Sequence, residues 1–123
     1  MSRDNAYLRD ILNAAQAIQR FIAGVTTEQF QANEEKYEAV NRKFEIIGEA
    51  TKRLSPEMRS QFQDIPWQLA AAMRDVLIHD YDDVNLDVVW KTATEDLPPL
   101  IARLEAYLAV HPPPDPAGPL ADV

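Results

Sequence analysis

Apolar residues recur at intervals of three or four along most of the chain, and no stretch alternates apolar and polar residues as a half-exposed strand does. This spacing predicts an all-α protein. A first amphipathic helix is expected from about Asp4 to Gly24, and a second long one from about Asn33 to Leu54. Their apolar stripes are Leu8, Ile11, Leu12, Ala15, Ile18, Ile22 and Val25 in the first, and Tyr37, Val40, Phe44, Ile47, Ala50 and Leu54 in the second.

Hydroxyl residues and prolines mark the ends of shorter elements. Thr26 and Thr27 can cap a short helical turn, because a threonine oxygen accepts a hydrogen bond from a first-turn amide. Ser55-Pro56 predicts a brief helix reaching about Phe62, since proline fits the first helical turn, where its missing N–H costs nothing.

The second half of the chain repeats this pattern. Asp64-Ile65-Pro66-Trp67 is expected to open a helix that runs toward His79. A last helix is expected from about Leu86 to Val110, with a kink or a break at Pro98-Pro99. Residues 1–110 then form one helical domain, and residues 111–123, rich in proline, form a disordered tail.

Composition restricts the possible functions. The chain has 12 Lys and Arg against 20 Asp and Glu, a formal charge of −8, and no cysteine. Disulfides and thiolate metal sites are excluded, and any nucleic-acid role must depend on a local basic site rather than on overall charge. Apolar runs are shorter than the roughly 20 residues of a membrane span, and the start resembles no signal peptide. We therefore expect a cytoplasmic protein without membrane segments.

Metal and cofactor sites find little support in the sequence. There are only two histidines and no glycine-rich phosphate loop. Asp80, Asp82, Asp83 and Asp87 cluster, but they lack the glycine and closing glutamate of a calcium loop. We expect neither a metal nor a cofactor.

Arg74, His79 and Tyr81 are the most suggestive group for chemistry. Histidine titrates near neutral pH and can move the protons of RNA cleavage, while arginine binds and stabilises a phosphate. On a continuous helix, five residues at about 100° each place Arg74 and His79 some 140° apart. Either the helix ends near His79, or a symmetric neighbour completes the site. The structural alternative is a salt-bridged arginine, a histidine at a helix end and a packed tyrosine.

Five short motifs together resemble one family. The stretches AVNRKFEIIGEA at residues 39–50, IPW at 65–67 and MRDVLIHDY at 73–81 are similar to those of HepT-like proteins in the HEPN superfamily, as are Val89-Trp90 and Asp96-Leu97-Pro98. The resemblance implies an antiparallel up-and-down helical bundle that dimerises. It also implies a metal-independent endoribonuclease, the toxin of a toxin–antitoxin pair, neutralised by an MntA-type nucleotidyltransferase.

The resemblance also implies roles for individual residues. Arg74 would bind the scissile phosphate of tRNA or another RNA, His79 would transfer protons, and Tyr81 would accept AMP from the partner enzyme. Asp75 occupies a position that is most often asparagine in the superfamily. On the second long helix, Arg42 is a candidate phosphate contact and Glu49 a candidate supporting residue, although a salt-bridged surface carboxylate is the simpler interpretation of Glu49.

Three functions therefore compete. The first is the toxin ribonuclease. The second is a non-catalytic subunit that binds nucleotide or substrate for a nucleotidyltransferase, with Tyr81 as acceptor and Arg74 as anion holder. The third is a helical dimerisation module without activity, which Asp75 and the acidic balance would favour.

Overall fold

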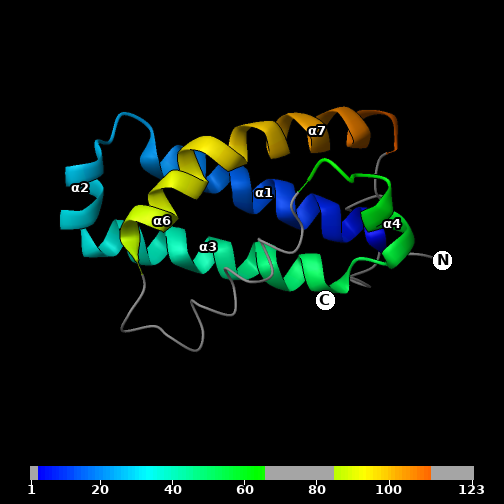
Figure 1. Ribbon diagram of the computed structural model, residues 1–123, viewed down its shortest axis with the longest axis horizontal. Helices are drawn as coiled ribbons and strands as arrows, with labels where there is room; N and C mark the ends of the chain where they lie inside the picture. The colour runs from blue at the N-terminus through cyan, green and yellow to red at the C-terminus, as the bar shows by residue number, and fades with distance from the viewer. Residues whose placement is uncertain (1–2, 66–84, 112–123) are drawn as a thin grey trace, which may run out of the picture.

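The computed structural model describes residues 3–65 and 85–111, and within these ranges the chain forms helices and no strand (Figure 1). The predicted all-α helical bundle is confirmed. α1 and α3 run antiparallel along each other, α7 packs along α1 in the direction of α3, and α6 contacts α2 (Figure 1). The helices are α1 (Asp4–Ile22), α2 (Thr27–Ala32), α3 (Glu34–Arg53), α4 (Pro56–Ser60), α6 (Leu86–Lys91) and α7 (Leu97–Val110).

Local signals set the helix ends close to where the sequence predicts them. α1 ends at Ile22, two residues before the expected Gly24, which adopts a φ of +72° that a glycine tolerates without strain. Thr26 and Gln29 form a reciprocal capping box at the start of α2. Asn33 caps α3 by accepting a hydrogen bond from the backbone N–H of Lys36 at 3.0 Å.

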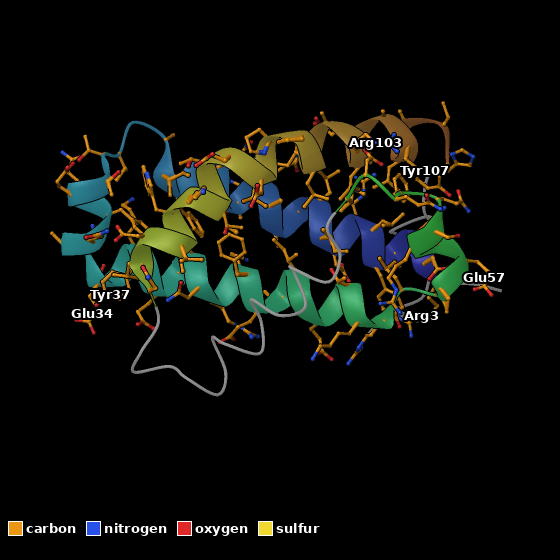
Figure 2. The ribbon with its side chains drawn as sticks, in the orientation of Figure 1. Arg3, Glu34, Tyr37, Glu57, Arg103 and Tyr107 are labelled. Carbon is orange, nitrogen blue, oxygen red and sulfur yellow. The ribbon has the colours of Figure 1, made fainter. Side chains whose placement is uncertain are left out.

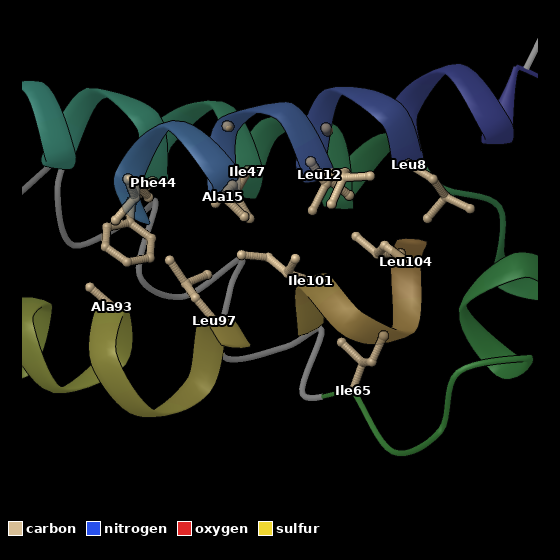
Figure 3. Close-up of a cluster of buried hydrophobic side chains, with 14 of the residues drawn as sticks. Leu8, Leu12, Ala15, Phe44, Ile47, Ile65, Ala93, Leu97, Ile101 and Leu104 are labelled. Carbon is tan, nitrogen blue, oxygen red and sulfur yellow. The ribbon is translucent and has the colours of Figure 1, made fainter. Parts of the chain in front are cut away.

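The core lies where α1, α3 and α7 meet, and Figure 3 shows their side chains interdigitating. Most of the predicted apolar stripes are buried here, including Phe44, which is 4% exposed. Trp90 is half-buried and packs its ring 5.2 Å from that of Phe30. Trp67 lies outside the described residues. Burial of these stripes from three helices provides the main favourable free energy of folding. The buried hydrophobic residues of the three helices are Leu8, Ile11, Leu12, Ala14, Ala15, Ala17, Ile18, Val40, Phe44, Ile47, Ala50, Leu97, Ile101, Leu104 and Leu108.

The last predicted helix changes type before its prolines rather than at them. A π-helical segment, Thr92–Asp96, separates α6 from α7, and the N–H of Leu97 bonds to the carbonyl of Thr92, five residues earlier. Pro98 and Pro99 then occupy the first turn of α7, where an N–H is not required. The expected irregularity is therefore present, but its physical form is a wider turn upstream of the prolines.

An ion pair between Asp64 and Arg103 connects the segment after α4 to α7. Arg103 donates to both carboxylate oxygens of Asp64, at 2.8 and 3.1 Å, and its guanidinium lies 5.1 Å from the ring centre of Phe62. The hydrogen bonds from Arg103 lower the pKa of Asp64 below its usual value, and Asp64 in turn raises the pKa of Arg103. Figure 2 shows Arg103 and Tyr107 on the stretch of α7 that faces this segment.

Candidate functional site

A pocket of about 270 Å³ lies between α1 and α3 and contains two of the residues selected from the sequence, Arg42 and Glu49. Both project from α3, seven residues apart, because positions i and i+7 share a helix face. α1 forms the opposite wall through Tyr7 and Asp10. The remaining lining residues, all from α3, are Glu45, Ile46, Ala50 and Arg53.

Two ion pairs occupy the α3 wall. Arg42 Nη1 lies 3.1 Å from Glu45 Oε2, and Arg53 Nη2 lies 3.1 Å from Glu49 Oε1. These are the i,i+3 and i,i+4 spacings at which helix side chains meet. The Arg42 side chain is 69% exposed, so its guanidinium can leave Glu45 for another anion at little cost.

The charge of this pocket is mixed. Asp10, Glu45 and Glu49 contribute three negative charges against two positive ones from Arg42 and Arg53. A phosphate entering here would have to displace a glutamate from an arginine, so the pocket offers an exchangeable contact rather than a strong anion site.

Sequence reasoning brought together Arg42 and Glu49, with Glu45 one helical turn before Glu49, but did not assign Asp10 and Arg53 to this pocket. Arg53 could have been found, because it stands four residues after Glu49 on the same predicted helix. No local signal marks Tyr7 and Asp10, since only the packing of α1 against α3 brings them there.

Asn41, next to Arg42 on α3, is a second notable residue. Its side chain is 4% exposed, and its Oδ1 atom has no hydrogen-bond partner among the described residues. Leaving such a buried group unsatisfied costs about 1–3 kcal/mol, so an unpartnered amide oxygen needs an explanation. By contrast, the buried hydroxyl of Thr51 on the same helix donates to the carbonyl of Ile47 at 2.7 Å.

Four predicted site residues, Arg74, Asp75, His79 and Tyr81, lie outside the described residues. Within 3–65 and 85–111, no group of three or more His, Asp or Glu side chains is arranged to hold a metal ion. In the same ranges, no helix combines the length and the apolar character needed to cross a membrane.

Comparison with known proteins identifies the family. The model of the family "Ribonuclease HepT-like" matches residues 11–107, which include Arg42, Glu49 and the stretch from Arg74 to Tyr81. The chain belongs to the HepT-like ribonuclease family. The resemblance to HepT-like HEPN proteins and the predicted enzyme class, a ribonuclease, are thereby confirmed at the level of the family.

Relatives of this HepT-like chain carry consistent names. It is 40% identical over 99 residues to "Probable ribonuclease HepT" of Thermococcus cleftensis, which covers 80% of this chain and 90% of the relative. It is 34% identical over 108 residues to "Putative RNase TTE0752" of Caldanaerobacter subterraneus subsp. tengcongensis, covering 88% and 96% of the two chains. No solved structure gives a significant match.

Proposed function

We propose that this HepT-like protein is a metal-independent endoribonuclease that acts in the cytoplasm as the toxin of a toxin–antitoxin pair, with tRNA or mRNA as its substrate. The observation that carries the proposal is the family match over residues 11–107, within which the sequence keeps Arg74, His79 and Tyr81 at the spacing of the family motif. The relatives named as ribonucleases, which align over most of their own length, support it.

In the proposed reaction the ribose 2′-oxygen attacks the adjacent phosphorus, and the bond from phosphorus to the 5′-oxygen breaks. One proton leaves the 2′-hydroxyl and one joins the departing 5′-oxygen, and His79 exchanges protons in these steps because imidazole titrates near neutral pH. Arg74 stabilises the negative charge that develops on the phosphate oxygens. Asp75 lies beside it in sequence and supports the site.

The α1–α3 pocket contributes supporting residues in this proposal. Arg42 is the exposed cation that can exchange Glu45 for an RNA phosphate, and Glu49 holds the neighbouring Arg53 at 3.1 Å. A homodimer completes the site, because a two-fold axis can bring an Arg74 and a His79 together although a single continuous helix would separate them by about 140°.

Regulation is proposed to act at Tyr81. A partner nucleotidyltransferase of the MntA type would transfer AMP from ATP to the Tyr81 hydroxyl, with release of pyrophosphate and the hydroxyl proton. Tyr81 lies two residues from His79 in the sequence. The added phosphate would repel RNA and its bulk would obstruct the site. The test is intact-protein mass spectrometry after expression with the partner: a gain of AMP that Tyr81→Phe abolishes supports the claim, and AMP on another residue contradicts it.

Cleavage itself is tested with purified protein and total tRNA on a denaturing gel, with EDTA present. Wild type should cut the RNA, while His79→Ala and Arg74→Ala should lose at least 100-fold in rate. Arg20→Ala, which removes an exposed cation from α1, is the matched control and should cut normally. If folded, dimeric wild type leaves RNA intact but accepts AMP at Tyr81, the protein is instead a binding subunit of the nucleotidyltransferase.

A further inference from the structure

The pocket between α1 and α3 is apolar in its middle and cationic at its two ends. Along α3, Arg42 and Arg53 line the ends, and Ile46 and Ala50 lie between them. The two arginine side chains are 69% and 58% exposed, whereas Ile46 is half-buried and Ala50 is buried. Tyr7 of α1 adds an aromatic ring to the opposite wall. This composition suits a flat, weakly polar group in the middle of the pocket and anions at its ends.

Charge alone does not hold a polyanion in this pocket. Its three carboxylates outnumber its two guanidinium groups, and the whole chain carries a formal charge of −8. RNA binding through phosphates depends on lysine and arginine, so binding here needs a second source of affinity. Stacking of a base on an aromatic ring is such a source, because a neutral base requires no net positive charge.

Tyr7 presents a ring face that a planar group can reach. Arg3, the residue before α1, places its guanidinium carbon 5.7 Å from the centre of the Tyr7 ring. This distance is close to the outer limit of about 6 Å for a cation–π contact, and Arg3 is exposed, so the contact is loose. Guanidinium groups and nucleobases are both planar and both stack on aromatic rings. A base can therefore take the place of Arg3 over this ring.

We propose that Tyr7 stacks against an unpaired base of single-stranded RNA, while Arg42 and Arg53 bind phosphates on either side of that nucleotide. The inference rests on the proposed function and names the form of RNA that the pocket accepts. The two arginines are eleven residues apart, or about 16 Å along an α-helix, which phosphates a few nucleotides apart can span. Each arginine exchanges the glutamate that it pairs with, Glu45 or Glu49, for a phosphate oxygen.

Stacking on Tyr7 distinguishes unpaired from paired RNA. In a duplex each base is stacked between its neighbours and paired along its edge, so bringing it to the ring requires unstacking and unpairing. In loops and at single-stranded ends the bases can turn outward and stack on aromatic side chains. The substrate class is therefore RNA with an unpaired segment.

Binding to a His79→Ala protein, which does not cut, measures the role of Tyr7. The probe is a fluorescein-labelled single-stranded RNA of about ten nucleotides, read by fluorescence anisotropy. Tyr7→Leu should raise the Kd about 5–100-fold, because it removes a stacking ring, whereas Tyr7→Phe keeps the ring and should change the Kd less than about twofold. The matched control is Tyr37→Leu, since Tyr37 also packs partly buried against the core but does not line the pocket. It should leave the Kd unchanged.

An RNA of the same length without bases tests whether the ring contacts a base. This abasic RNA should bind the protein with Tyr7 about 5–100-fold more weakly than the normal RNA does. Tyr7→Leu should weaken binding of the abasic RNA by less than about a further twofold, because ring and base form one interaction. Its phosphates remain, so Arg53→Ala should reduce the magnitude of the salt slope by about 0.7 with either RNA.

Several outcomes would overturn the inference. A Tyr7→Leu protein that is folded by circular dichroism and binds normal RNA as tightly as the protein with Tyr7 is one, and equal affinity for normal and abasic RNA is another. If Tyr7→Leu does not fold, Tyr7→Met takes its place, since the flexible methionine side chain fills irregular space. Equal dependence on Tyr7 with a duplex RNA would overturn the assignment to unpaired bases. AMP that displaces the RNA at concentrations near the Kd of the RNA would assign the pocket to a free nucleotide instead.

Failure of the inference and failure of the proposed function give different results. If wild type cuts tRNA and His79→Ala does not, but neither Tyr7→Leu nor loss of the bases weakens binding, the ribonuclease stands and only the stacking role is wrong. If wild type neither cuts nor binds single-stranded RNA, the proposed function fails and the inference fails with it.

Discussion

Ser55 joins two helix ends through one side chain. Its hydroxyl donates to Asp4 Oδ2 at 2.6 Å and accepts from the backbone N–H of Met58 at 3.1 Å, while its own N–H donates to Asp4 Oδ1 at 2.9 Å. Asp4 is only 8% exposed, so its carboxylate depends on these bonds. The cap on α4 follows from the local Ser-Pro sequence, but the contact to Asp4, 51 residues away, could not be predicted from it.

Removing the Ser55 hydroxyl should destabilise the folded protein, because this serine is partly buried and its hydroxyl has two partners. We expect Ser55→Ala to lower the free energy of unfolding by about 1–3 kcal/mol, because it removes a helix cap and leaves a buried carboxylate oxygen with one bond fewer. Urea denaturation followed by circular dichroism measures the change, and Ser55→Thr, which keeps a hydroxyl, should lose much less. A Ser55→Ala protein as stable as wild type would show that the backbone N–H bond alone holds Asp4.

At the scale of elements, the spacing of the buried residues explains why a π-helical segment forms between α6 and α7. The buried residues Val89, Ala93, Leu97 and Ile101 follow one another at intervals of four. On an α-helix each such step turns about 40° past a full circle, so three steps would carry the stripe about 120° around the helix. A π-helical turn takes more residues and returns the stripe to the core. Periodicity thus contained the signal, although the prolines alone suggested a break at residues 98–99, after the π-helical segment has ended.

Deleting Thr94 tests this account of the segment. One residue fewer should convert Thr92–Asp96 to ordinary α-helix and rotate Val89 and Ala93 by about 100° relative to Leu97, which exposes part of the core. We expect a loss of about 3 kcal/mol or more, as for other core disruptions. Thr94→Ala is the control, since it removes only the hydroxyl bonds to the Trp90 and Lys91 carbonyls and should cost little. A deletion as stable as this control would show that the register does not depend on the π turn.

At the scale of the whole molecule, the sequence predicts the fold better than the site. Amphipathic stripes and caps are local, so α1, α3 and α4 could be placed within about two residues, as expected of strong periodic patterns. The pocket depends on which faces of α1 and α3 meet, and the burial of Asn41 Oδ1 without a hydrogen-bond partner among the described residues depends on how the chain packs. Neither property has a signature in residue spacing, which is why both appear only in three dimensions.

The formal charge of −8 makes RNA binding depend on a few local cations, and salt dependence can count them. For single-stranded RNA, each phosphate contact contributes about −0.7 to the slope of log affinity against log salt concentration. In a His79→Ala background that binds without cutting, Arg42→Ala should weaken binding and reduce the magnitude of this slope by about 0.7, as measured by fluorescence anisotropy. Glu45→Gln frees Arg42 from its ion pair and removes a negative charge, so it should tighten binding instead. The control Arg20→Ala should change neither the affinity nor the slope beyond the small effect of overall charge. If Arg42→Ala leaves the slope unchanged, Arg42 does not contact an RNA phosphate and only pairs with Glu45 on α3.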